Sequence, residues 1–128
     1  MPTPAERPRA LLISRDLFFT SKVTGTAQAL GVDVRVIGDA AAAAELVNGQ
    51  SLRCVFIDLA DEGLDVSAFF AGLKPDLNVP VIAFGSHVAT ARLQQARDAG
   101  CTEVMPRSRF STGLPGLLQQ YCGGKPAQ

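Results

Sequence analysis

An apolar run that ends in a carboxylate, residues 54–59 with the sequence CVFIDL, constrains the fold more than any other stretch of this chain. Branched and aromatic residues without polar alternation are typical of a strand buried on both faces, as at the centre of a parallel sheet. Asp58 then lies at the carboxyl end of that strand. Ligands and reacting groups collect at this edge of open α/β sheets, so Asp58 is the first candidate functional residue. The alternative is that Asp58 only caps the following loop or helix.

Strand-like and helix-like segments alternate along the rest of the chain. Apolar runs predict strands over residues 9–13, 32–37, 53–58, 79–84 and 102–105. Apolar faces and good helix formers predict helices over residues 17–30, 40–47, 64–73, 88–99 and 114–121. We interpret residues 106–110 as a rigid basic loop and place Pro115 in the first turn of the last helix. The predicted helix caps are Ser14 or Asp16, Asp39 and Ser86.

Five alternating strand and helix units in 128 residues predict one α/β domain, with a parallel sheet between two layers of helices. The half-polar segment 32–37 belongs at an edge of the sheet, and the apolar segment 53–58 belongs in its middle. The flavodoxin-like three-layer sandwich with strand order 2-1-3-4-5 meets both requirements. We place the domain at residues 9–122 and expect residues 1–8, which hold three prolines, and 123–128 to be flexible.

The composition limits which classes of partner and which cellular compartment we expect for this protein. Twelve basic and twelve acidic residues give a formal net charge of zero, so we expect neither nucleic acid nor an anionic membrane as a partner. The first eight residues lack the apolar core of a signal peptide, and no apolar run reaches membrane-spanning length. The three cysteines, Cys54, Cys101 and Cys122, are an odd number without metal-ligand spacing. We interpret them as reduced, inert thiols of a cytoplasmic protein.

Three short motifs of this chain are similar to parts of one known domain. They are DL at residues 58–59 followed by GLD at 63–65, PVIAF at 80–84, and AGCTEV at 99–104. In this order they resemble the phosphoacceptor strand with its loop, the fourth strand, and the last helix-to-strand junction of response-regulator receiver domains, the CheY-like family. The resemblance covers residues 9 to about 122 and implies that Asp58 stands at the phosphoacceptor position.

The chain departs from this family where the family carries its chemistry. Two acidic residues hold magnesium at the end of the family's first strand. Their counterparts here are Ser14 and Arg15, with Asp16 one step later. The hydroxyl residue after the family's fourth strand corresponds to Gly85, with Ser86 adjacent.

Two further departures lie around the fifth strand. The switching aromatic of the family corresponds to Val104, and its lysine before a proline corresponds to Arg107. Only the acceptor Asp58 is unchanged. The predicted site around Asp58 is therefore lined by Ser14, Arg15, Asp16, Gly85, Ser86 and Arg107.

These departures change what the site can do. Phosphoryl transfer to a carboxylate relies on a divalent cation, and magnesium prefers oxygen ligands. Arg15 would bring a fixed positive charge to the metal position, so we predict no metal, no other cofactor and no catalytic residue. We expect Arg15 or Arg107 to form an ion pair with Asp58 instead. The alternative is that Asp16 moves in as a substitute magnesium ligand.

Other polar residues near this edge allow further interpretations. Ser86, Arg107 and Arg109 would form an anion site if they lay together at a helix start. The alternative is that one arginine pairs with Asp58 and the other is solvated. We do not interpret Ser86 and His87 as part of a hydrolase triad with Asp58, because adjacent residues at a helix start point apart.

Three functions follow from these observations. The first is a stand-alone, degenerate receiver, not an enzyme, that acts as a phosphorylation-independent signalling or protein-interaction module. We expect its protein partner on the surface of the fourth helix, fifth strand and fifth helix, with Arg92 and Arg97 as contact charges, or on the arginine loop beside that surface. The second is a true phosphoacceptor receiver that uses Asp58 and magnesium in a phosphorelay. The third is a small-anion or nucleotide sensor.

Overall fold

The structure is a computed structural model that describes residues 8–123. Of the expected flexible termini, all but Pro8 and Gly123 lie outside the described residues. The elements are, in chain order, β1 (Arg9–Ile13), α1 (Leu17–Ala29), β2 (Asp33–Ile37), α2 (Ala40–Gly49), β3 (Cys54–Asp58), α3 (Val66–Ala71), β4 (Val81–Gly85), α4 (Thr90–Ala99), β5 (Glu103–Pro106) and α5 (Arg107–Cys122). Within this described range, no helix is both long enough and apolar enough to cross a membrane.

The five strands form one parallel sheet in the order β2-β1-β3-β4-β5, as predicted. All five residues of β3 are buried, because strands flank it on both sides and helices cover both faces. β2 lies at one edge and is half exposed, which its alternating polar residues predict. In the register of the sheet, Asp58 pairs with Phe84 and Gly85 pairs with Pro106. The carboxyl ends of β3, β4 and β5 therefore meet at one edge.

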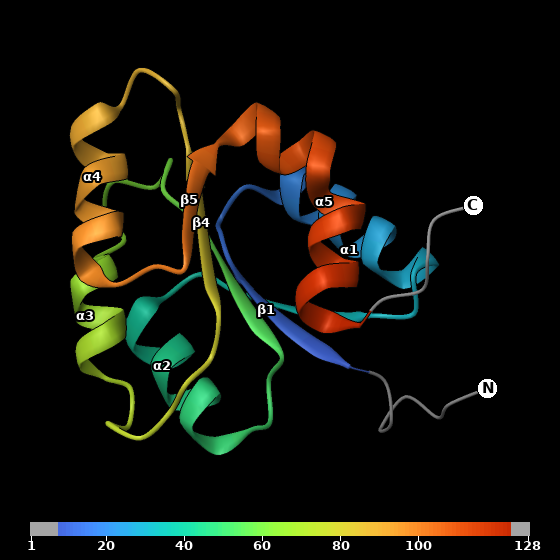
Figure 1. Cartoon of the computed structure of the whole chain (residues 1–128), viewed down its shortest axis with the longest axis horizontal. Coiled ribbons are helices and arrows are strands. Elements are labelled where there is room, and N and C mark those ends of the chain that lie inside the picture. The colour runs from blue at the N-terminus through green and yellow to red at the C-terminus, as the bar shows by residue number, and fades with distance from the viewer. Residues whose placement is uncertain (1–7, 124–128) are drawn as a thin grey trace.

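The helices form two layers around this sheet. Figure 1 shows α1 and α5 on one face and α2, α3 and α4 on the other. Alternate side chains of a strand point to opposite faces, so Phe56 of β3 packs in the cluster under α1 and α5. Its neighbour Ile57 packs in the cluster under α2, α3 and α4. Each cluster holds fully buried side chains from strands and helices, which is the core expected for a three-layer sandwich.

The prediction of a basic loop over residues 106–110 is wrong. α5 begins at Arg107, directly after β5, and Pro115 lies in its interior instead of its first turn. The physical reason is Phe110, which is fully buried and stacks on Phe84 with a centroid distance of 4.0 Å. Phe110 shares a helical face with Leu114 and the leucines that follow, so residues 107–113 bury apolar surface only as helix.

The caps of two helices confirm the sequence prediction, and one does not. The Asp16 side chain accepts the Phe19 amide and caps α1, and the Asp39 side chain accepts the Ala42 amide and caps α2. Ser86 does not cap α4, which begins at Thr90 after a turn. The Ser86 hydroxyl accepts only a long bond of 3.4 Å from the Val88 amide. The other element boundaries differ from the prediction by a few residues, where packing decides how far a helix or strand extends.

Candidate functional site

Asp58 is the last residue of β3, and its side chain is almost fully buried. Only 3% of the residue is exposed. Its Oδ1 accepts the backbone amide of Ala60 at 3.0 Å, and its Oδ2 accepts the hydroxyl of Ser14 at 2.8 Å. Arg107 donates to both oxygens. A buried carboxylate requires such partners, because an unpaired charge in the protein interior is very costly. The bond from Ala60 is the local cap of the following loop, whereas the other three hydrogen bonds come from Ser14, which directly follows β1, and from Arg107 of α5.

Arg107 is the positive charge that faces Asp58. Its Nη2 donates to Oδ1 at 3.0 Å and to Oδ2 at 2.9 Å. Its Nη1 lies 3.4 Å from Oδ2 of Asp16. The guanidinium carbon lies over the ring of Phe19, 4.4 Å from the ring centroid. Arg107 is also the first residue of α5, where the helix dipole disfavours a cation. The two carboxylates and the ring offset that cost and orient the guanidinium.

Arg15 does not pair with Asp58. Its Nε donates to the carbonyl of Gly38 at 3.0 Å and lies 3.5 Å from Oδ2 of Asp61. The Arg15 side chain is 70% exposed, whereas the preceding Ser14 is buried. Adjacent residues at a strand end point to different sides, so the chain can present only one of the two to Asp58. The expected ion pair with Asp58 therefore involves Arg107 alone.

Ser14 and Asp16 connect β1 and α1 to this pair. The Ser14 hydroxyl donates to Asp58 and accepts the backbone amide of Asp16 at 3.2 Å. The Asp16 carboxylate accepts the Phe19 amide and contacts Arg107. The pKa of the Asp16 carboxyl lies below its ordinary value, mainly because the carboxylate accepts the Phe19 amide and also because Arg107 lies beside it. Ser14, Asp58, Arg107 and Asp16 thus form one connected polar network at the carboxyl edge of the sheet.

Gly85 has a packing reason to lack a side chain. A Cβ at this position would lie 3.1 Å from the Cβ of Leu59 and 3.6 Å from a methyl group of Leu93. Contacts near 3.1 Å are tighter than almost all real Cβ contacts, so a larger residue would displace its neighbours. The absence of a hydroxyl side chain at position 85 is thus linked to the close approach of Leu59, which directly follows Asp58.

The contacts of the three predicted anion-binding residues do not support an anion site. Arg107 is engaged by Asp58 and Asp16. Arg109 is exposed and lines a surface depression with Glu103 and other residues of β5 and α5. Ser86 is exposed in the turn before α4, and its hydroxyl accepts the Val88 amide. This arrangement matches the alternative in which one arginine pairs with Asp58 and the other is solvated.

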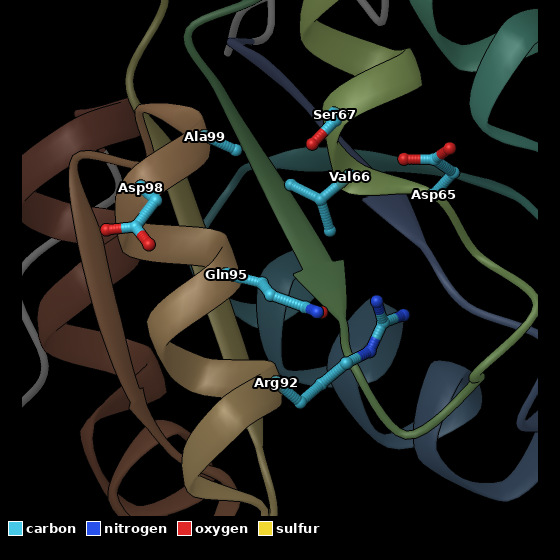
Figure 2. A pocket seen from close by; sticks show the side chains of 7 residues that line it. All are labelled: Asp65, Val66, Ser67, Arg92, Gln95, Asp98 and Ala99. Atoms are coloured by element: carbon cyan, nitrogen blue, oxygen red, sulfur yellow. The ribbon is translucent and has the colours of Figure 1, made fainter.

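Arg92 has a structural role that the sequence analysis missed. Figure 2 shows its side chain extending from α4 toward the end of the neighbouring strand, along a groove between α3 and α4 of about 330 Å³. The guanidinium donates to the backbone carbonyls of Leu59, Asp61 and Leu64 at 3.3, 2.8 and 2.6 Å. Arg92 therefore holds the loop after β3 and is not a free contact charge. No sequence pattern links residues about thirty positions apart.

The first turn of α1 exposes two apolar side chains beside this network. Phe18 is 93% exposed and Leu17 is 79% exposed. The adjacent Phe19 points inward and packs on Phe84 and Phe110, with centroid distances of 5.1 and 5.9 Å. Of the two adjacent phenylalanines, the structure therefore leaves one on the surface and places the other under Arg107.

Comparison with known proteins relates this architecture to solved structures. No protein-family model matches the sequence, and no curated protein matches it either. The receiver domain of the sensor histidine kinase PA1611 from Pseudomonas aeruginosa PAO1, with a magnesium ion coordinated in its active site cleft, superposes with a TM-score of 0.77. The two sequences are 18% identical, and the match covers 91% of this chain and 98% of that chain.

Two further structures match equally broadly. The response regulator RPA3017 in red light signaling of R. palustris gives a TM-score of 0.72 and 15% identity, over 88% of this chain and 92% of that chain. A co-crystal structure of the Saccharomyces cerevisiae histidine phosphotransfer signaling protein Ypd1 and the receiver domain of Ssk1 also matches. It gives a TM-score of 0.73 and 10% identity, over 91% of this chain and 90% of that chain. With its strand order, its two helical layers and these matches, the chain has the fold of the receiver domains of response regulators.

Proposed function

We propose that this chain is a degenerate receiver, a signalling module that binds another protein without being switched by phosphorylation. The observation that carries the proposal is the position of Arg107, whose Nη2 lies 3.0 and 2.9 Å from the two oxygens of Asp58. A carboxylate that attacks a phosphoryl group must present a free oxygen to it. Here both oxygens accept hydrogen bonds and the residue is 3% exposed. Attack would require the Arg107 guanidinium to move away from Asp58.

The residues around Asp58 do not fit a magnesium ion. Magnesium requires octahedral oxygen ligands at short range, usually one or two carboxylates with several waters. The Arg107 guanidinium already contacts both Asp58 and Asp16, and its charge would repel the ion. Asp16 is also engaged as the cap of α1. Within residues 8–123, no group of three or more histidine, cysteine or acidic side chains lies close enough to hold a metal. Because Arg107 and the capping role of Asp16 occupy the carboxylates that would hold magnesium, we propose that the module acts without this cofactor.

Phosphoryl uptake from a small donor tests this proposal. The full chain is incubated with acetyl phosphate and magnesium, and its intact mass is measured. We expect no phosphoryl adduct, and we expect magnesium titration to leave the protein unchanged. Uptake that disappears in Asp58→Asn would overturn the proposal and establish the phosphoacceptor alternative. Arg107→Lys is the informative companion variant, because it retains a positive charge but cannot reproduce the guanidinium contacts.

We infer that the partner is a protein that contacts α4, β5 and α5. Support comes from Arg97 and Arg109, which are exposed charges on this face, and from the depression that Arg109 lines with Met105 and Leu117. The co-crystal structure with Ypd1 shows that the receiver domain of Ssk1 contacts another signalling protein. Arg97→Glu should weaken capture of the partner, and Lys22→Glu on α1 is the matched control. If Lys22→Glu or Phe18→Ser weakens capture and Arg97→Glu does not, the face is wrongly assigned.

A further inference from the structure

Cys54 and Cys122 are 68 positions apart in the chain, yet their sulfurs lie 2.7 Å apart. Cys54 is the first residue of β3, and Cys122 is the last residue of α5. Both are free thiols with 0% exposure, inside the cluster under α1 and α5. Their separation in the sequence shows nothing of this contact, and the interpretation of three inert thiols did not anticipate it.

We propose that Cys54 and Cys122 form a modification site, at which an oxidant of the peroxide class converts the two thiols into an intramolecular disulfide. The inference goes beyond the proposed function and does not depend on it. It requires two sulfurs in contact, one sulfur that ionises first, and a route for the oxidant.

The two thiols differ in how readily they ionise. The contact with Cys54 lowers the pKa of the Cys122 thiol. The same contact and burial raise the pKa of the Cys54 thiol. The thiolate is the reactive form of cysteine, and Cys122 lies in the last turn of α5, where local opening exposes it before Cys54 of the central strand. Cys122 is therefore the attacking sulfur and Cys54 is the resolving sulfur.

The reaction then proceeds in two balanced steps. The Cys122 thiolate attacks one oxygen of hydrogen peroxide and breaks the O–O bond, which gives a sulfenic acid and hydroxide. The hydroxide takes up the proton that Cys122 had released and becomes water. The Cys54 sulfur attacks the sulfenic sulfur of Cys122, the S–S bond forms as the S–O bond breaks, and the hydroxide that leaves takes the Cys54 proton and becomes a second water. Two thiols and one peroxide thus give one disulfide and two waters.

The end of α5 provides the route for the oxidant. Cys122 is the last helical residue, and Gly123 follows in the left-handed conformation with a φ of 67°. Helix ends open locally at low cost compared with global unfolding, so the last turn exposes Cys122 without unfolding the sheet. Cys54 then meets the oxidised sulfur when the turn closes again.

Cys101 is an internal control for this site. It packs against the cluster under α2, α3 and α4, on the opposite face of the sheet from the other two cysteines. Burial raises the pKa of its thiol to about 11. A sheet separates Cys101 from Cys54 and Cys122, so it cannot enter an intramolecular disulfide with either in the folded chain.

The bond would join the two elements that also carry the Asp58–Arg107 pair. Asp58 lies at the other end of β3 from Cys54, and Arg107 lies at the other end of α5 from Cys122. Oxidation would therefore attach the carboxyl end of α5 to the central strand, in addition to the ion pair at the start of the helix. Amide hydrogen exchange in α5, and the local opening of the helix that it reports, should become slower in the oxidised protein.

Peroxide treatment of the folded full chain tests the proposal. Remaining thiols are blocked with N-ethylmaleimide, and the digest is mapped by mass spectrometry without reduction. We expect a Cys54–Cys122 cross-linked peptide in a monomeric product, with Cys101 alkylated. Because the bond closes a long loop, the oxidised form should melt about 5 to 15 °C higher than the reduced form. Dithiothreitol should abolish that difference.

Two variants keep the test decisive. Cys101→Ala should leave both the cross-link and the shift in Tm unchanged, and Cys122→Ala should abolish both. Should Cys122→Ala fold poorly, the peptide map of the unmodified sequence still decides. Recovery of Cys54 and Cys122 as alkylated thiols, a sulfinic acid at Cys122 without a cross-link, or disulfides only between separate molecules would each overturn the proposal.

Discussion

The guanidinium carbon of Arg107 lies 4.4 Å from the ring centroid of Phe19, so the cation that faces Asp58 also covers an aromatic ring. The same ring packs on Phe84 and Phe110, which anchor β4 and α5 to each other. The polar network at the sheet edge and the core beneath it are therefore continuous. A substitution at Phe19 should therefore affect both the polar network and the core.

Removal of the Arg107 charge should destabilise the fold. Arg107→Met leaves Asp58 buried without its cation, and we expect the free energy of unfolding in urea to fall by roughly 1 to 4 kcal/mol. Addition of Asp58→Asn should restore part of this loss. Arg15→Ala is the matched control, because its pair with Asp61 is exposed and should contribute less than about 1 kcal/mol. Equal losses in Arg15→Ala and Arg107→Met would contradict this account.

The contact between Arg107 and Phe19 should appear as a coupling free energy. Phe19→Leu removes the π face but keeps an apolar side chain of similar reach. A double-mutant cycle of Phe19→Leu and Arg107→Met should give a coupling of about 0.5 to 1 kcal/mol in favour of the native pair. Additive effects of the two substitutions would show that the ring acts only through its packing on Phe84 and Phe110.

Tyr121 should titrate at unusually high pH. Its hydroxyl donates to the carboxylate of Glu103, and this bond, followed by burial, raises the pKa of Tyr121 to about 12. The folded-state pKa lies above the ordinary value of 10.0, so the bond stabilises the fold fully below pH 10. That contribution is lost as the pH rises through about 12.

The chain has one tyrosine, so its ultraviolet absorbance reports this group alone. Glu103→Gln should move the midpoint of the absorbance change toward 10, and the exposed Glu62→Gln should not. A midpoint that is unchanged in Glu103→Gln would rule out the hydrogen bond as the cause.

Arg92→Met should loosen the loop that follows β3. Three backbone carbonyls lose a charged hydrogen-bond donor in this variant. A hydrogen bond to a charged group contributes about 1.5 to 3 kcal/mol, and water can replace part of it, so we expect the free energy of unfolding to fall by about 2 kcal/mol. Amide exchange of residues 59–64 should also become faster. Arg97→Met on the exposed side of the same helix is the control and should change neither quantity. No change in loop exchange would mean that water replaces the guanidinium without cost.

The sequence by itself determined the framework of this protein. The apolar run that ends in Asp58 predicts a buried central strand, because only a strand covered on both faces needs no polar alternation. The half-polar segment 32–37 predicts an edge strand for the converse reason. The carboxylates of Asp16 and Asp39 predict helix starts, since a cap depends on side chains and amides only a few positions apart. Such local patterns were sufficient for the order of the elements and for the position of Asp58.

Only the tertiary structure decided which partner each side chain meets. Arg15 and Arg107 are equally plausible partners of Asp58 in the sequence, and the direction in which each leaves the backbone selects Arg107. The early start of α5 depends on the burial of Phe110 against Phe84, which lies on another strand. The contact between Cys54 and Cys122 exists because α5 runs back along the sheet to the beginning of β3. Contacts between distant residues depend on how layers pack, and no periodicity within one segment encodes that packing.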